Sequence, residues 1–129
     1  MENIIWFQNL NKPLFAPPDW VFTPVWIILY LMIFASLILF LKSKFYASKK
    51  TGLFFFITQL VLNIIWSPIF FGMQKIGLAL VILSLIWIFT LLTIIFFFKH
   101  SKLASLLLIP YLCWLSFAFY LNFGYFVLN

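Results

Sequence analysis

Apolar residues dominate four long stretches of the chain, and short polar segments separate these stretches. The stretches cover residues 24–41, 52–71, 76–98 and 103–128. Each is close to or longer than the roughly 20 residues that a helix needs to cross a hydrocarbon core about 30 Å thick. The segment at 72–75 is long enough only for a tight turn, and the other two connections are rich in lysine. The pattern therefore predicts a single membrane domain over residues 1–129 with four membrane-spanning helices.

The first 23 residues do not fit this pattern. They hold several prolines, and a proline lacks an N–H group and restricts the residue before it, so no regular helix can run through them. The same segment carries too much aromatic surface to float free in water. We therefore expect a structured lid at the membrane interface, over the mouth of whatever the helices enclose. The residues that define this lid are Trp6, Lys12, Pro13, Pro17, Pro18 and Trp20.

Composition agrees with a membrane protein. The chain is 67% hydrophobic and 8% charged, whereas about a quarter of the residues of a soluble domain are charged. The net charge of +6 comes from eight lysines, with no arginine. Most of these lysines lie between the apolar stretches, so they indicate topology and contacts with the lipid bilayer, and we expect no nucleic-acid partner.

Lysine placement also predicts an orientation. The two lysine-rich connections lie on the side of the membrane opposite both termini, and the positive-inside rule places them in the cytoplasm. The abundance of Phe, Ile, Lys and Asn without Arg is associated with AT-rich bacterial genomes. We therefore expect a multi-pass protein of a bacterial cytoplasmic membrane, with both termini outside.

Groups that would carry catalysis are missing from the apolar stretches. None of the four contains Asp, Glu, Lys or Arg, so the usual charged parts of a proton relay or an ion-coupled pump are lacking. His100 is the single histidine and has no second His or Cys near it in the sequence, which makes it a poor metal or haem ligand. The sequence therefore predicts no catalytic residue, no metal site and no required cofactor.

Polar residues recur inside the second stretch. Gln59, Asn63, Trp66 and Phe70 follow one another at spacings of four, three and four, so they share one helical stripe. Amides within hydrocarbon must be hydrogen-bonded, and Gln59 and Asn63 are therefore expected to face other helices or a cavity. The plainer alternative is that they only join helices together.

The fourth stretch carries a similar aromatic face. Ala118 is its smallest member and leaves room beside Trp114. Two aromatic stripes with a few polar tips suit a pocket for a flat, mostly apolar ligand, although Trp and Tyr could instead form interfacial belts. Pro110 predicts a kink or a local break within this stretch. The face consists of Tyr111, Trp114, Ala118, Leu121 and Tyr125, with Asn122 at its edge.

Three motifs together resemble one known family. They are WFQNLNKPLFAPPDWVFTPVWIILY at 6–30, TQLVLNIIWSPIFFG at 58–72 and IPYLCWLSFAFYLN at 109–122. In this order they resemble the translocator protein family, also called tryptophan-rich sensory proteins (TspO) and, in animals, the peripheral benzodiazepine receptor. The resemblance implies an all-α membrane protein, here a four-helix bundle similar to the five-helix TspO fold without its first helix. A lid that hangs from the N-terminus, rather than from a preceding helix, would then be more mobile than the lids of its relatives.

The resemblance also implies a ligand. Members of the family bind porphyrins such as protoporphyrin IX and, in some cases, sterols, and they are often dimeric, so a homodimer is expected. The family tryptophans matched by Trp26 and Trp114 are implicated in porphyrin binding and in a light-dependent porphyrin breakdown. The expected ligand-binding residues are Trp26, Tyr30, Gln59, Asn63, Trp66, Phe70, Tyr111, Trp114, Ala118 and Asn122.

Three functions are compatible with these residues. The first is a membrane protein that binds or senses a porphyrin or a similar planar hydrophobic ligand. The second is an enzyme that degrades porphyrin in the light, by electron transfer from an indole. The third is a structural or assembly subunit without a ligand. The first two need the same tryptophans, so the sequence does not separate them.

Overall fold

The structure, a computed structural model, describes residues 6, 8–14, 19–42 and 49–129. Within these residues it contains four long α-helices and no strand, which confirms the predicted all-α fold class. A 3-10 turn, η1, precedes the first of them, and a π-helical segment, η2, follows the second. The elements are η1 (Asp19–Val21), α2 (Phe22–Lys42), α3 (Lys49–Ser67), η2 (Pro68–Gly72), α4 (Ile76–Phe98) and α5 (Lys102–Leu128).

All four long helices are long and apolar enough to cross a membrane. Helix α4 has the bounds expected from the sequence, whereas α2, α3 and α5 each begin slightly earlier. Helix α2 begins at Phe22 rather than at Pro24, because a proline in the first turn removes no intrahelical hydrogen bond.

Pro110 does not interrupt α5, which is helical throughout. One ladder hydrogen bond is nevertheless absent at Pro110, because proline has no N–H group. Leu108 and Tyr111 on either side of the proline are at most 1% exposed. Packing on both sides holds the helix together although one backbone N–H is missing.

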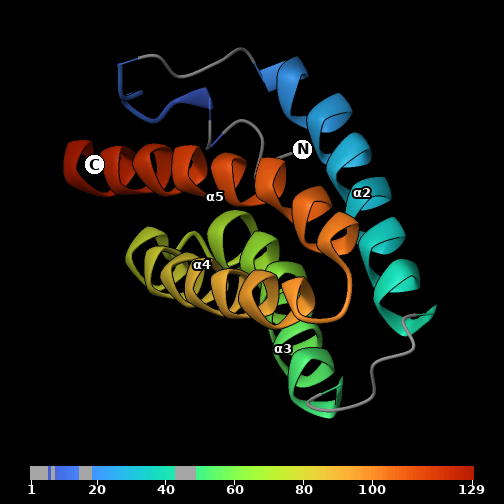
Figure 1. Cartoon of the computed structure of the whole chain (residues 1–129). Helices are drawn as coiled ribbons and strands as arrows, with labels where there is room; N and C mark the ends of the chain where they lie inside the picture. Colours follow the sequence, from blue (N-terminus) through green and yellow to red (C-terminus); the bar gives the residue numbers. More distant parts are fainter. Residues whose placement is uncertain (1–5, 7, 15–18, 43–48) are drawn as a thin grey trace.

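The helices pack in the order α2, α5, α4, α3. Helix α5 lies between α2 and α4, and α4 lies between α5 and α3 (Figure 1). Helices α2 and α3 therefore stand at the two ends of the row. Residues 8–14 run along the C-terminal half of α5, on the side away from α4 (Figure 1).

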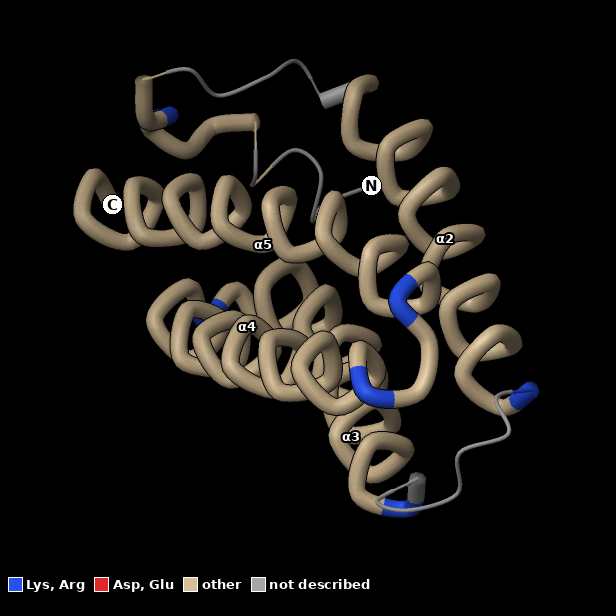
Figure 2. The backbone as a smooth tube through the Cα atoms, viewed as in Figure 1, with Lys and Arg blue, Asp and Glu red and all other residues tan. Residues whose placement is uncertain are grey.

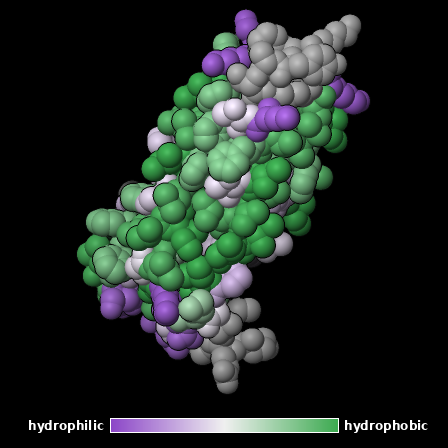
Figure 3. All heavy atoms as spheres, turned by 90° about the horizontal axis from the view of Figure 1, so that it is seen from below, coloured by the Kyte–Doolittle hydropathy of each residue, from purple (hydrophilic) through white to green (hydrophobic). Residues whose placement is uncertain are grey.

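The surface has the pattern of a membrane protein. A broad hydrophobic region separates hydrophilic groups at the two ends of the molecule (Figure 3). Lysines gather at the end where α2 and α4 stop and where α3 and α5 begin (Figure 2). We call this the lysine-rich end.

The core is closely packed with aromatic side chains near the lysine-rich end. The Phe40 and Phe97 rings stack with centroids 4.0 Å apart and planes 7° apart, and Phe56 stacks on Phe97 at 5.7 Å. All three side chains are at most 1% exposed. Open space inside the bundle is found in the opposite half, which contains the two aromatic stripes.

Candidate functional site

A cavity of about 650 Å³ lies in the half of the bundle away from the lysine-rich end. Its volume is in the range of small-molecule sites, roughly 300–1,000 Å³. Its walls come from all four long helices and are mostly aromatic or aliphatic, with a few polar groups. The lining includes these members of the expected set: Trp26, Tyr30, Asn63, Trp66, Phe70, Trp114, Ala118 and Asn122.

One wall is built around Trp26. Phe22, Trp26 and Tyr30 are four residues apart on α2 and therefore share a face. The Trp26 ring lies 5.6 Å from that of Tyr30 and meets Trp114 of α5 edge-on at 6.2 Å. Phe22 also contacts Trp114, with ring centroids 5.9 Å apart. These rings form a continuous aromatic surface between α2 and α5.

The opposite wall belongs to α3. The Trp66 ring stacks on Phe70 with centroids 5.1 Å apart. The Trp66 indole Nε1–H donates to Asn122 Oδ1 at 3.1 Å, and Asn122 Nδ2 donates to the carbonyl of Ile76 at 3.1 Å. Trp66 is therefore held in a fixed orientation by a hydrogen bond from α3 to α5.

A π-helical segment shapes the end of this wall. In η2 the Met73 amide donates to the Pro68 carbonyl at 2.9 Å, which is the wider spacing of a π-turn. The result is that Phe71 as well as Phe70 faces the cavity. Such π-bulges are frequent at functional sites.

A hydrogen-bonded network forms the floor of the cavity. Tyr30 donates to Asn63 Oδ1, and Asn63 Nδ2 donates to the Tyr111 hydroxyl at 2.7 Å. Tyr111 donates to Gln59 Oε1 at 2.7 Å, and Thr90 donates to the same oxygen at 3.4 Å. Gln59 and Tyr111 are at most 1% exposed and do not line the cavity. They lie beneath it and hold Asn63 in place.

Two buried donors have no hydrogen-bond partner among the described residues. They are Gln59 Nε2, in the floor, and the indole Nε1 of Trp114, in the wall. A buried polar group without a partner costs about 1–3 kcal/mol.

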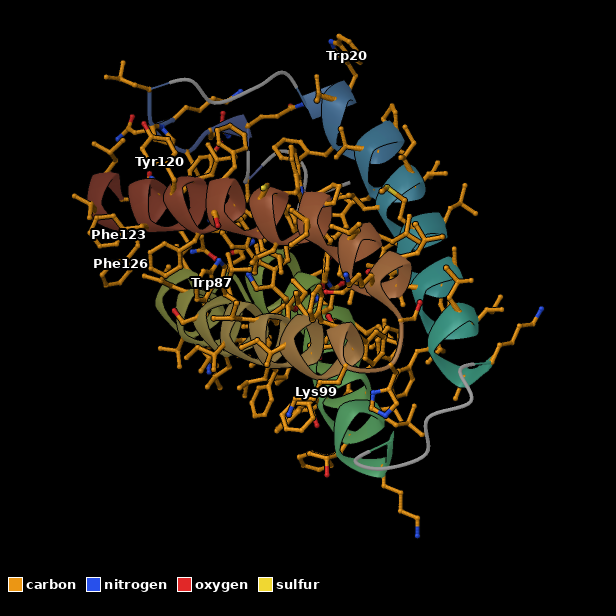
Figure 4. The ribbon with its side chains drawn as sticks, viewed as in Figure 1. Trp20, Trp87, Lys99, Tyr120, Phe123 and Phe126 are labelled. Atoms are coloured by element: carbon orange, nitrogen blue, oxygen red, sulfur yellow. The ribbon has the colours of Figure 1, made fainter. Side chains whose placement is uncertain are left out.

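The lid residues are placed differently from one another. Trp6 packs on Phe70, with ring centroids 5.7 Å apart, whereas Trp20 is 73% exposed and points away from the bundle (Figure 4). Lys12 is exposed and Pro13 is buried. Pro17 and Pro18 lie outside the described residues.

Hydrogen bonds and one close packing contact hold the lid against the C-terminal part of α5. No sequence pattern predicts these contacts. The Asn11 amide donates to Asn129 Oδ1 at 3.1 Å, and Asn129 Nδ2 donates back to the Asn11 carbonyl at 3.1 Å. Tyr120 points from α5 toward the lid and donates to the Leu14 carbonyl at 2.6 Å (Figure 4). Pro13 packs directly on Gly124, where an added Cβ would lie 2.5 Å from the Pro13 Cβ.

A methyl group at Gly124 is expected to loosen the lid. Pro13 must move in a Gly124→Ala variant, and the Asn11–Asn129 hydrogen bonds move with it. We expect hydrogen exchange at the Asn11 amide to accelerate on the order of tenfold. Gly72→Ala is the matched control, because an added Cβ there has nothing within 4 Å. Unchanged hydrogen exchange at Asn11 in the Gly124 variant would show that the contacts between the lid and α5 do not hold the lid in place.

No sequence pattern identified several of the residues that line the cavity. Leu83 and Ile86 contribute the α4 wall, but α4 is apolar along its whole length, so no periodic signal distinguishes its inner face. Thr90 of α4 belongs to the floor network, and for the same reason no sequence pattern predicted it. Phe22 and Thr23 were placed in the lid rather than in the helix, although their spacing to Trp26 could have indicated the shared face.

Sequence comparison with known proteins identifies the family of this chain. The sequence profile described as the TspO/MBR family matches residues 1–128. The chain belongs to the TspO/MBR family. The resemblance noted in the sequence is therefore confirmed, and this member of the TspO/MBR family is an integral, multi-pass membrane protein.

Relatives in the TspO/MBR family come from bacteria, archaea and animals. The tryptophan-rich protein TspO of Chlorobaculum tepidum is 47% identical over 125 residues, which are 96% of this chain and 79% of that protein. The tryptophan-rich protein TspO of Archaeoglobus fulgidus is 43% identical over 96% of this chain and 80% of its own length. The human translocator protein is 39% identical over 95% of this chain and 73% of its own length.

Proposed function

We propose that this protein binds a porphyrin, or a similar planar and mostly apolar molecule, in the cavity between α2, α3 and α5. The observation that carries the proposal is an aromatic cavity of about 650 Å³ whose lining includes Trp26, Trp66 and Trp114 from three different helices. Aromatic side chains around a concave, mostly apolar site with a few polar groups are typical of small-molecule sites. A flat and mostly apolar ligand would bury these rings.

The aromatic walls suit a flat ligand. Indole and phenyl rings bind planar molecules by offset or edge-on contacts, each worth about 0.5–1.5 kcal/mol beyond the area that is buried. Trp26 and Trp66 stand on different helices, and their polar neighbours Tyr30 and Asn122 offer hydrogen bonds at the edges. Most of the lining is apolar, as in sites that bury most of a small molecule.

The lysine-rich end supports an orientation as part of the same proposal. Lys42, Lys99 and Lys102 lie at that end, and the cavity lies in the other half. With the lysines in the cytoplasm, the cavity and the lid are in the outer half of the bilayer. The homodimer and the sterol ligand that the family resemblance implies stay predictions.

Porphyrin titration of the purified protein in lipid nanodiscs tests the proposal. In the dark, protoporphyrin IX is expected to quench tryptophan fluorescence saturably. Trp114→Phe replaces the indole of the wall with a smaller phenyl ring, and we expect about tenfold weaker binding, equivalent to roughly 1.4 kcal/mol.

Trp87→Phe is the matched control, because Trp87 lies on α4, bonds to Ser116 at 2.9 Å and does not line the cavity. Its dissociation constant should equal that of the wild type. The dark measurement keeps binding separate from any photochemical change of the porphyrin. Absence of saturable quenching in the wild type would overturn the proposal.

A further inference from the structure

Three residues that line the cavity are also exposed on the outside of the bundle. They are Thr23 on α2 and Ile64 and Ser67 on α3, and Ile64 has an exposed fraction of 61%. A cavity whose lining is exposed is open at that point. The opening therefore lies between the flanks of α2 and α3 that carry these residues.

Helices α2 and α3 stand at the two ends of the row and do not form a packed pair. Among the described residues they meet at two levels. Near the lysine-rich end, a Cβ added at Gly52 of α3 would lie 3.1 Å from the ring of Phe40 of α2. About 15 Å farther along α2, Tyr30 and Asn63 form the only hydrogen bond that joins α2 to α3 in the described part of the chain. Beyond that bond the two helices spread apart toward the lid (Figure 1).

The Tyr30–Asn63 bond is therefore the lower edge of the opening. Thr23 lies two turns before Tyr30 on α2, so the opening is about 10 Å high. The residues on both of its sides belong to segments that are long and apolar enough to cross a membrane. The opening therefore faces the hydrocarbon of the bilayer rather than water.

The lid is held more firmly than the two sides of this opening. Its described hydrogen bonds to α5 come from Asn11, which pairs with Asn129, and from Leu14, which accepts from Tyr120. No described lid residue lines the cavity. A ligand that entered under the lid would have to break these bonds. A ligand that enters between α2 and α3, above the lower edge, breaks no hydrogen bond of the described residues.

We propose that ligands reach the cavity from the hydrocarbon of the bilayer, through the opening between α2 and α3. The inference rests on the proposed function for the identity of the ligand. A flat apolar molecule partitions into the bilayer, because the hydrophobic effect drives it out of water. Lipid tails are as apolar as leucine side chains, so the passage from bilayer to cavity exposes no apolar surface to water. When no ligand is bound, a lipid acyl chain fills the opening.

A chemical bridge across the opening tests this route. Thr23→Cys and Ser67→Cys place one thiol on each side, in a Cys113→Ser background because Cys113 is an exposed free cysteine. A short reagent that reacts with both thiols then ties α2 to α3. We expect this bridge to slow the association of protoporphyrin IX about tenfold or more, measured in nanodiscs in the dark by tryptophan quenching. The reference is the same variant with each thiol modified separately.

A bridge between the lid and α5 is the matched control. Tyr120 donates to the Leu14 carbonyl, so Leu14→Cys and Tyr120→Cys in the same background allow the reagent to fix the lid on α5. The association rate should then change by less than about twofold. A lid bridge that slows association as much as the side bridge, or a side bridge without effect, would overturn the inference. Absence of porphyrin binding to the wild type would instead reject the proposed function.

Lipid photolabelling of the wild type needs no porphyrin. A phospholipid with a diazirine in the middle of an acyl chain is activated by light in nanodiscs, and mass spectrometry maps the labelled residues. We expect labels on Trp66, which lines the cavity, as well as on Trp87, which does not. Labels on Trp87 without labels on Trp66 would overturn the inference, because no acyl chain would then reach the cavity. Labels on Trp66 in a protein that binds no porphyrin would support the opening and reject only the proposed function.

Discussion

An Ala118→Trp variant is expected to lose porphyrin binding while it keeps its fold. Ala118 lines the cavity on α5, four residues after Trp114. A large ring at this position enters open space rather than a packed core, so the overpacking cost of about 1–3 kcal/mol should be largely avoided. The ring would occupy the room that a flat ligand needs. We expect at least a hundredfold loss of affinity for protoporphyrin IX, about 2.7 kcal/mol.

The control for this variant is Phe119→Trp. Phe119 is the next residue on α5, is 38% exposed and does not line the cavity. The Phe119→Trp variant introduces the same side chain on the lipid-facing side of the helix. Circular dichroism should show the same helix content in both variants, and the fluorescence titration should show loss only at 118. An Ala118→Trp protein that binds as the wild type does would place the ligand outside this cavity.

The largest loss of stability is expected for Phe97→Ala. Phe97 is fully buried between the rings of Phe40 and Phe56. In water-soluble cores a Phe→Ala change costs about 3–5 kcal/mol. Lipid is as apolar as the protein interior, so the transfer part of that cost is small in a membrane and the lost packing remains. We therefore expect about 2–3 kcal/mol in the free energy of unfolding.

Unfolding in mixed micelles with increasing sodium dodecyl sulfate measures this free energy. Phe98→Ala is the control, because Phe98 is 54% exposed although it is adjacent in sequence. A change away from packed features usually stays within about 0.5 kcal/mol. Equal destabilisation by the two variants would show that the aromatic stack at the lysine-rich end is not a main source of stability.

Sequence pattern predicted the fold because membranes impose a strong constraint. Every backbone polar group within hydrocarbon must be bonded inside its own segment, so long apolar stretches become helices. Helix α4 illustrates this, since its bounds Ile76–Phe98 coincide with the apolar stretch. At Pro110 the helix continues although the proline supplies no N–H group, because tertiary packing on both sides keeps α5 continuous.

Helical spacing also predicted much of the candidate site, but not which residues of the shared face line the cavity and which lie beneath it. Gln59 and Asn63 share a stripe on α3, and only Asn63 reaches the cavity. A difference of one helical turn places Gln59 between α3 and α4, where Thr90 and Tyr111 surround its amide. The helical period of the sequence predicts which face of a helix is buried. It does not predict at which residues along that face the neighbouring helices move apart to leave a cavity.

The lid shows the same division between sequence and structure. Its prolines and aromatic residues predicted a structured segment that is not a regular helix. The contacts that hold it come from Asn11 and Asn129, which are 118 residues apart in the chain, and from Tyr120 and Gly124 on α5. Polar groups so distant in sequence carry no local pattern, because their pairing depends on where α5 ends relative to the lid.

The sequence by itself determined that this is a helical membrane protein, with four apolar stretches in the given chain and with aromatic and amide stripes, because hydrophobic length and helical period are local properties. Tertiary structure alone decided that these stripes enclose a cavity in one half of the bundle. It also decided that the Trp114 indole N–H has no hydrogen-bond partner among the described residues and that Gln59 lies beneath the cavity. These features depend on how α2, α3, α4 and α5 pack, and packing is set by contacts between residues far apart in the chain.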